Sequence, residues 1–372
     1  MIDFLSVDAL RPKVIKCIEK YISLSKHQSL TVGFYRRGKW FIFSNEDMPT
    51  PLLYDIGSVS KTLTAHLILS LVQKGLLDLH TSVSAYLDLP KGEYPTIYQL
   101  LTHTAGYGHL TPVEITVPSL LQSRYARRNV YRGCTAQTVL KCLARRKNRK
   151  PRGYSYSDFS YAVLAVVAER VTGEDFCPLF ERFVQEELGM HQTVVTAPEH
   201  LRQPLAMLGD GAIDFWKWEK NNPYIAGGGL VSNIQDMLAY ISLQIESDEP
   251  YITDAHQICK ESISPKRNLA SCIGWHTYTK SNRFWHVGGA GTFRSSVIVN
   301  RKRKIGVVVL GNSKGVASAN VHYLAKMLYS EMKINKIDFE KLANRNTSTP
   351  GFGKADFVEY YNELKKDFEV NL

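Results

Sequence analysis

The chain has 372 residues, of which 44% are hydrophobic and 22% charged, so it can bury a substantial core in one large domain or two ordinary ones. The longest apolar run near its middle, residues 162–168, is far too short to span a bilayer. The first five residues include an acid where a signal peptide needs a basic region, so we expect a cytoplasmic protein. Six cysteines without CxxC or metal-ligand spacing predict reduced, mostly buried thiols and no metal site.

The first predicted elements are a helix and a β-hairpin. Residues 6–24 carry apolar side chains three and four positions apart, which predicts a helix. Residues 30–35 and 39–43 are β-rich runs separated by Arg36-Arg37-Gly38, a pattern typical of a hairpin. We expect the helix to pack on the sheet that this hairpin begins.

A second apolar helix pattern begins near Ser58 and ends at Lys74-Gly75, a cation and a glycine that commonly terminate helices. Lys61 follows Ser58 by three residues and so lies on the same helical face, within reach of the hydroxyl. A serine becomes a good nucleophile when a base takes its proton, and a lysine can serve if burial and the helix N-terminus lower its pKa. Two further Ser-x-x-Lys pairs, Ser23/Lys26 and Ser330/Lys333, lie in ordinary amphipathic patterns, so the spacing alone is weak evidence.

Residues 111–152 form a basic insertion with a helix predicted at 136–146. Between residues 123 and 152 the chain carries no acid and eleven cations, as many as its whole net charge of +11: Arg124, Arg127, Arg128, Arg132, Lys141, Arg145, Arg146, Lys147, Arg149, Lys150 and Arg152. One interpretation is a solvated surface segment, and another is a docking surface for an acidic partner or substrate. Nucleic acid is a weaker candidate, because the aromatic residues Tyr125 and Tyr131 belong to no recognisable binding module.

The second half begins with helices and ends with strands. An apolar helix is predicted from residue 162 to Gly173, another at 174–188, and a third after a glycine-rich loop, capped by Ser232. That triple-glycine loop lacks the lysine and spacing of a phosphate-binding loop. Alternating patterns predict strands at 273–278, 284–288, 293–299 and 305–310, followed by a helix at 317–332 and a loosely attached tail.

Three motifs carry a family resemblance. Gly57-Ser58-Val59-Ser60-Lys61-Thr62, Tyr156-Ser157-Asp158 and His286-Val287-Gly288-Gly289 resemble the three motifs of the serine β-lactamase and penicillin-binding protein superfamily, in the branch of class C β-lactamases, D-aminopeptidases and esterases. The resemblance implies an α+β fold, β-lactamase/transpeptidase-like, with an antiparallel sheet flanked by helices plus a mostly helical subdomain. It implies one catalytic domain over residues 1–335, with the α/β part at about 1–75 and 265–335 and the helical part at about 76–264; residues 336–372 would be an extension.

The resemblance also assigns roles. Ser58 would attack a carbonyl, Lys61 and Tyr156 would share the general acid and base roles, and His286 would shape the leaving-group side. The amides of Ser58 and Gly289 would form an oxyanion hole, and the small Gly288-Gly289 pair would let an edge strand approach the substrate.

Two further residues qualify the resemblance. Asp158 replaces the family's usual asparagine, and an ionised carboxylate only accepts hydrogen bonds, so it puts amide-side-chain recognition in doubt while it could hold Lys61 charged. The earlier Leu100-Leu101-Thr102-His103-Thr104 stretch also resembles the family, and we expect His103 to satisfy buried backbone groups rather than to act in catalysis.

Several functions share this machinery, and none needs a cofactor. An esterase, amidase or D-amino-acid peptidase acting on a small-molecule or peptide acyl substrate fits better than a β-lactamase, because histidine offers less dependable positive charge than lysine at the third motif. An acyltransferase using a carrier-bound or otherwise activated acyl donor is an alternative. A non-catalytic scaffold on the same fold is the alternative from another class.

Overall fold

The structure is a computed structural model that describes residues 2–4, 16, 18–19, 29–44, 52–109, 129–148, 153–196, 207–208, 211–212, 215–264, 269–278, 281–312 and 318–333. Of the helix predicted at residues 6–24, it describes Lys16, Ile18 and Glu19, all helical. The predicted tail and the pair Ser23/Lys26 lie outside the described residues. No helix in the described ranges is long and apolar enough to cross a membrane.

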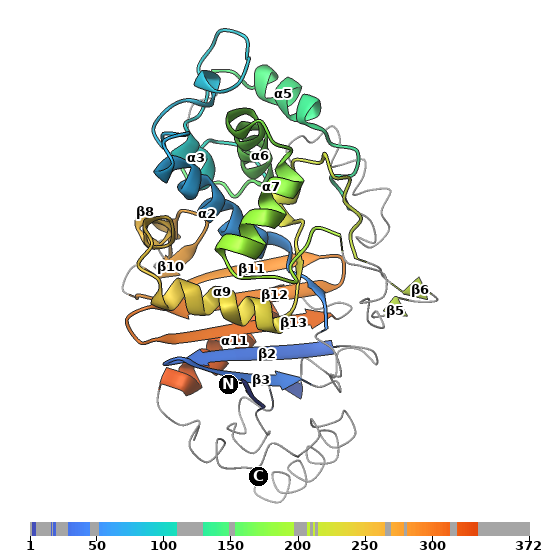
Figure 1. Cartoon of the computed structure of the whole chain (residues 1–372), viewed down its shortest axis with the longest axis vertical. Coiled ribbons are helices and arrows are strands. Elements are labelled where there is room, and N and C mark those ends of the chain that lie inside the picture. The colour runs from blue at the N-terminus through green and yellow to red at the C-terminus, as the bar shows by residue number, and fades with distance from the viewer. Residues whose placement is uncertain are drawn as a thin grey trace, which may run out of the picture.

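A mixed sheet of nine strands forms the lower half of the described chain in Figure 1. Its order is β1-β3-β2-β13-β12-β11-β10-β9-β8; β1 and β3 are parallel and all other neighbours antiparallel. The strands are β1 (Ile2–Phe4), β2 (Ser29–Arg36), β3 (Lys39–Ser44), β8 (Ile258–Ser264), β9 (Leu269–Cys272), β10 (His276–Tyr278), β11 (Phe284–Ala290), β12 (Phe293–Asn300) and β13 (Ile305–Asn312). Two small pairs, β4 (Tyr54–Asp55) with β7 (Val231–Ser232) and β5 (Met207–Leu208) with β6 (Gly211–Ala212), lie apart from it.

The sheet is covered on both faces, because its central strands carry apolar residues at successive positions. On β2, Leu30, Val32 and Phe34 join the hydrophobic cluster under α11 (Ser318–Lys333), whereas Tyr35 joins the cluster on the other face. Helix α9 (Ile234–Glu246) packs on that second face. A side chain at Gly33 would meet Ile234 at 2.8 Å, so the glycine lets α9 lie close to the sheet.

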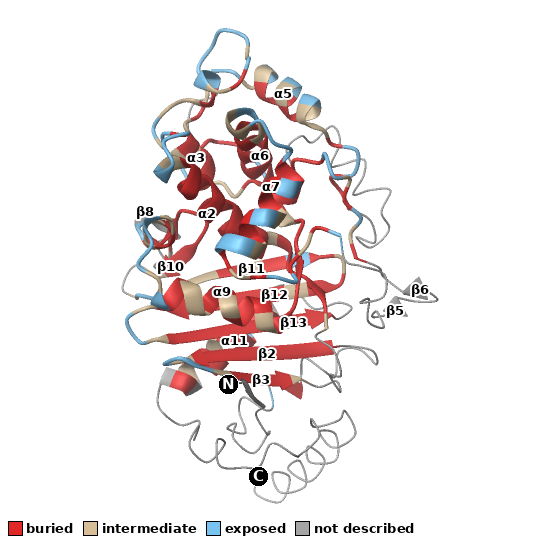
Figure 2. Cartoon of the chain, in the orientation of Figure 1, coloured by how far each residue is buried: buried red, intermediate tan, exposed pale blue. Residues whose placement is uncertain are grey.

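Helices fill the region above the sheet in Figure 1: α2 (Ser60–Gln73), α3 (Ile97–Leu101), α5 (Ala136–Arg145), α6 (Asp158–Thr172), α7 (Phe176–Arg182) with a π-helical turn (Phe183–Glu187), α8 (Ile225–Gly228) and α10 (Pro250–Thr253). The described residues also include three 3-10 turns, η2 (Gly57–Val59), η3 (Val83–Ala85) and η6 (Asp254–His256). Figure 2 shows α2 as mostly buried, and α6 is buried from Asp158 to Ala168. Helix α2 begins at Ser60, directly after the 3-10 turn that contains Ser58, and every residue from Ser60 to Leu71 is buried.

The predicted hairpin, the helix that ends at Lys74-Gly75 and the strands of the second half are confirmed, with three corrections. Of the strand predicted at 273–278, only β10 is a strand, because residues 273–275 turn the chain from β9 into β10, with Gly274 at a φ of +74°. The side chain that caps α9 is Asn233, not Ser232, since its oxygen accepts from the amide of Asp236 at 2.9 Å. Within the predicted helical part, 76–264, α9 packs on the sheet and β8 joins it.

Candidate active site

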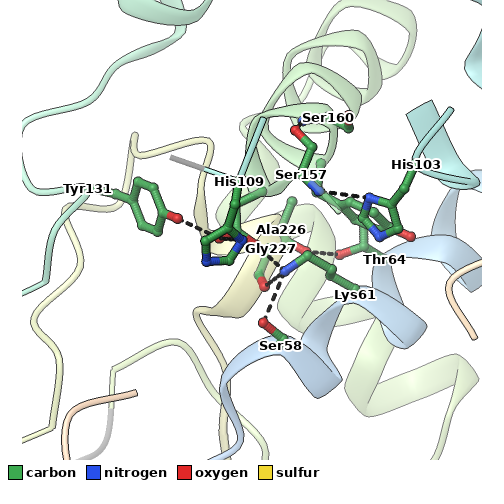
Figure 3. A network of polar contacts seen from close by, with 12 residues as sticks. Ser58, Lys61, Thr64, His103, His109, Tyr131, Ser157, Ser160, Ala226 and Gly227 are labelled. Carbon is green, nitrogen blue, oxygen red and sulfur yellow. Dashed lines mark hydrogen bonds and ion pairs between the residues drawn. The ribbon is translucent and has the colours of Figure 1, made fainter. Parts of the chain in front are cut away.

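Ser58 lies in the 3-10 turn that leads into α2, and Lys61 lies one turn later. The side chain of Ser58 is partly exposed, whereas that of Lys61 is completely buried. Lys61 Nζ is 3.1 Å from Ser58 Oγ, as Figure 3 shows. The predicted approach of these two groups is therefore present, with the hydroxyl open to a substrate and the amine shielded from solvent.

The Lys61 amine has three polar partners from separate parts of the chain. Besides Ser58, it donates to the carbonyl oxygen of Gly227 at 2.5 Å, on α8, and forms an ion pair with Asp158, at the start of α6. A protonated lysine has three N–H donors, so these contacts satisfy a charged amine at rest. Burial nevertheless lowers the pKa of Lys61 below its usual value, although Asp158 opposes the shift.

Asp158 is buried and lies at the positive N-terminus of α6. Burial alone would raise its pKa, but the charges of Lys61 and His109 and hydrogen bonds from Lys61 and Tyr131 bring the pKa below its usual value. The carboxylate is thus ionised and occupied by donors. This geometry agrees with the expectation that an aspartate here holds Lys61 charged.

Tyr156 lies against the same amine, with Lys61 Nζ 4.9 Å from its ring centroid. Burial and the charge of Asp158 raise the pKa of Tyr156 well above its usual value, and a hydrogen bond with Ser58 only partly opposes this. The His103 ring lies beside that of Tyr156, with centroids 4.5 Å apart, and its Nδ1 accepts from the amide of Ser157 at 3.1 Å. His103 therefore satisfies a buried backbone group, as predicted, and it adopts a positive φ of 58°.

Strand β11 brings the third motif against the Ser58 turn. Gly57 has a φ of +49°, and a side chain on it would lie 2.5 Å from the amide nitrogen of Gly289. A side chain at Gly288 would lie 2.0 Å from the carbonyl oxygen of Ile56. Gly288 is therefore required by the protein's own backbone, while Gly289 is exposed beside the nucleophile, as an oxyanion-hole amide would be.

The expectation of an edge strand is wrong for β11 as a whole, because β11 runs between β10 and β12, but the pairing differs along the strand. Its register with β10 includes only Phe284 and Trp285, whereas with β12 it extends from Phe284 to Ala290. Over residues 286–290, the described strands therefore pair with β11 only on the β12 side.

His286 is buried rather than solvent-facing. Its Nδ1 lies 2.8 Å from the carbonyl oxygen of Val287, and its ring stacks on His276 at 5.2 Å. Burial, with the charges of His276 and Lys61, lowers the pKa of His286 well below its usual value. The third-motif position therefore carries a neutral imidazole, which supplies no positive charge to a substrate.

Three residues in the site were not predicted. Tyr131, from the segment before α5, donates a hydrogen bond to Asp158, and His109 Nδ1 lies 3.7 Å from the same carboxylate. His276, on β10, lies 6.5 Å from the Tyr156 ring, and burial lowers its pKa to about 4. None of the three lies in a recognisable local motif, although Tyr131 is one of the two aromatic residues of the basic insertion.

The remaining predictions concern metals and thiols. Within the described ranges, no group of three or more histidine, cysteine and acidic side chains is placed to hold a metal ion. The thiols of Cys134, Cys142, Cys177 and Cys272 are buried. The triple-glycine segment contacts α2 and the Ser58 turn, since Thr64 donates to the carbonyl of Ala226 at 2.8 Å and Gly227 accepts from Lys61.

Comparison with known proteins agrees with this geometry. The Beta-lactamase family profile matches residues 15–329, so the chain belongs to the β-lactamase family, within the superfamily of β-lactamase-like serine hydrolases. Protein flp of Staphylococcus aureus strain COL is 24% identical over 293 residues, which are 74% of this chain and 54% of that protein. A β-lactamase of Providencia stuartii is 28% identical over 201 residues, 52% of this chain and 47% of that protein. The chain thus spans about half the length of these curated relatives.

Solved structures show the same fold. The octameric penicillin-binding protein homologue of Pyrococcus abyssi has a TM-score of 0.69 at 22% identity, over 87% of this chain and 77% of that one. A class C β-lactamase of Rhodobacter sphaeroides has a TM-score of 0.70 at 16% identity, over 87% and 100% of the two chains. A D-stereospecific amidohydrolase of Streptomyces has a TM-score of 0.66 at 19% identity, over 86% and 98%. At these identities the likeness establishes the β-lactamase/transpeptidase fold.

Proposed function

We propose that this protein forms a covalent acyl-enzyme on Ser58 and hydrolyses esters or amides of small molecules or peptides. The observation that carries the proposal is the partly exposed Ser58 hydroxyl 3.1 Å from the fully buried Lys61 amine. Ser58 Oγ attacks the acyl carbonyl as its proton leaves, and the amides of Ser58 and Gly289 stabilise the oxyanion. The leaving group departs with a proton, and water then releases the acyl group from the serine.

Lys61 is the better candidate for the group that takes the serine proton. Its pKa lies below the ordinary lysine value, whereas that of Tyr156 is raised well above the ordinary tyrosine value. At neutral pH the phenol keeps its proton, so Tyr156 acts as a donor and relay toward the leaving group. Lys61 must lose a proton before it can accept one, and activity should therefore rise with pH.

Two features favour a substrate without a carboxylate beside the reacting bond. The third-motif residue His286 is neutral, and the one buried cation of the motifs, Lys61, is already paired with Asp158. Asp158 is an acceptor held by donors and cannot donate to a substrate carbonyl. Esters and uncharged amides need neither a cation nor an amide donor from such a site. β-Lactams and D,D-peptides would lack both as binding partners.

The single decisive experiment is covalent labelling with a fluorophosphonate. We expect the protein to gain the mass of one phosphonyl group, and Ser58→Ala to gain none. Ser330→Ala is the matched control: Ser330 shares the Ser-x-x-Lys spacing, but its hydroxyl is tied to the carbonyl oxygen of Lys326 at 2.9 Å. Absence of an adduct on the unaltered protein would favour the scaffold, and faster acyl transfer to an added amine than to water would favour the acyltransferase.

A further inference from the structure

Tyr131 is a buried phenol that reaches the active site from the basic insertion. Its hydroxyl donates to Asp158, and Asp158 pairs with Lys61. The Tyr131 phenol, the Asp158 carboxylate and the Lys61 ammonium thus form a chain of three groups, and its last member lies beside Ser58. Figure 3 shows that Tyr131 and Lys61 reach this group of residues from different parts of the fold.

Several contacts fix this phenol in place. The Tyr131 ring stacks on Tyr224 with centroids 4.2 Å apart and planes 8° from parallel. The amide nitrogen of Asn222 donates to the Tyr131 carbonyl at 2.8 Å, and the Tyr131 amide donates to Asn129 at 2.9 Å. Asn222 and Tyr224 immediately precede α8, whose Gly227 accepts from Lys61. One short segment therefore holds both Tyr131 and the amine.

We propose that Tyr131 is a positioning residue that sets, through Asp158, how readily Lys61 gives up its proton. The inference rests on the proposed function of Lys61 as the base. A donated hydrogen bond draws negative charge toward Tyr131 and away from Lys61. Without it the full charge of the carboxylate would act on the ammonium, and Lys61 would bind its proton more tightly.

The other ionisable groups around this chain of three groups come from several further elements. His103, which follows α3, is neutral, because burial and the charge of Lys61 lower its pKa well below the usual value. His109, after α3, faces the same carboxylate, and Tyr156 precedes it in sequence. Tyr224 interacts with the charge of Asp158 from the segment before α8. His276 on β10 and His286 on β11 interact with the charge of Lys61 and are neutral. Among the described residues, Tyr131 is the one whose hydroxyl donates a hydrogen bond to Asp158. Removing that hydroxyl therefore alters the three-group chain with the least effect on the other ionisable groups.

The test measures the rate of Ser58 phosphonylation against pH. Tyr131→Phe keeps the ring stack and loses only the hydroxyl, so the rising limb should move to higher pH by about half a unit to one unit, a three- to tenfold loss at fixed pH on that limb. Asp158→Asn removes the charge and should move the limb to lower pH. Tyr35→Phe is the matched control, because the hydroxyl of Tyr35 also donates to a carboxylate, that of Glu246 at 2.6 Å, between β2 and α9.

If Tyr131 has only a structural role, Tyr131→Phe should lower the labelling rate at every pH without moving the rising limb of the pH profile. That result overturns the inference, and so does a shift of the limb to lower pH. The titration of Lys61 followed by NMR in protein with ¹³C-labelled lysine gives the same midpoint without any reaction. If Tyr131→Phe does not fold, the titration midpoint of Lys61 is measured in Asp158→Asn instead. A midpoint equal to that of the unaltered protein overturns the inference, because Asp158 would then not control the proton on Lys61. Absence of Ser58 labelling in the unaltered protein instead overturns the proposed function.

Discussion

At the scale of single residues, Lys61 carries the largest expected effect. Lys61→Met keeps the length and burial of the side chain but removes the amine, so hydrolysis of a nitrophenyl ester should fall by about a hundredfold or more, the usual contribution of a general base. Lys74→Met, on the exposed cap of the same helix, should retain full activity. Hydrolysis by Lys61→Met within threefold of the unaltered protein would remove Lys61 from the mechanism.

Asp158 is expected to set the class of substrate. Asp158→Asn restores an amide donor at the place where the family usually has one, so the ratio of nitrocefin to nitrophenyl ester hydrolysis should rise, by about fivefold for one neutral hydrogen bond. Asp248→Asn, whose carboxylate is 96% exposed, is the control. An unchanged ratio would show that Asp158 does not determine the substrate class.

At the scale of elements, the packing of β11 on the Ser58 turn is the most sensitive contact. Gly288→Ala places a methyl group against the Ile56 carbonyl, and such overpacking typically costs about 1–3 kcal/mol of unfolding free energy. We expect a lower urea midpoint together with slower labelling of Ser58. Gly153→Ala, where a side chain meets nothing within 4 Å, should change neither. Equal stability of the two variants would mean that β11 shifts freely.

Helix α5 offers a test of the proposed docking surface for acidic partners. Arg145 and Lys147 are exposed at its end, whereas Arg146 is tied to Cys142 Sγ at 2.8 Å and is left in place. The double change of Arg145 and Lys147 to glutamate should lower kcat/KM a few-fold for a nitrophenyl succinate monoester and weaken its salt dependence, since exposed charges act over about 10 Å at 0.1 M salt.

Two comparisons make this docking test specific. Hydrolysis of uncharged nitrophenyl butyrate should be unaffected by the double change. The same change at Lys302 and Arg303, exposed in the turn between β12 and β13, should affect neither ester. Equal loss on both esters would show that α5 is a wall of the pocket and not a docking surface.

At the scale of the whole molecule, buried neutral histidines predict sensitivity to acid. Burial lowers the pKa of His66 and His276 to about 4 and that of His322 to about 3. It lowers the pKa of three others, His103, His256 and His286, well below the usual value. The unfolded chain binds protons as pH falls through about 6.5, while the folded protein does not until about 4, so stability is lost across that window.

Four carboxyl groups of the described residues act in the opposite direction. Burial raises the pKa of Asp55 and of Glu19 to about 7, and it raises the pKa of Glu169 and of Asp236 above the usual value, so their contributions grow as pH falls. Because six histidines outnumber them, the melting temperature should fall steadily between pH 6.5 and pH 4.5. His66→Gln should flatten this dependence, whereas His80→Gln, at an exposed position, should not. A melting temperature that stays constant down to pH 4.5 would contradict the argument.

Local patterns were sufficient for the elements and for the centre of the site. Helical spacing predicts that Ser58 and Lys61 share one face, although it does not distinguish them from the other Ser-x-x-Lys pairs. The strands on either side of the Arg301–Lys304 turn follow from their β-rich composition, since both predictions depend on residues close in sequence. The family resemblance then placed Tyr156, Asp158 and Gly289 beside Ser58, which the structure brings together.

Only the tertiary structure decided the surroundings of that centre. Tyr131 and His109 contact Asp158 from segments far from its helix, and His276 faces Tyr156 because of the register of β10 on β11. The place of β11 inside the sheet depends in the same way on which strands pair with it. Sequence spacing determines which side chains share a face of one helix or strand, whereas contacts between distant segments, and the pKa values that burial sets there, arise only when those segments pack together.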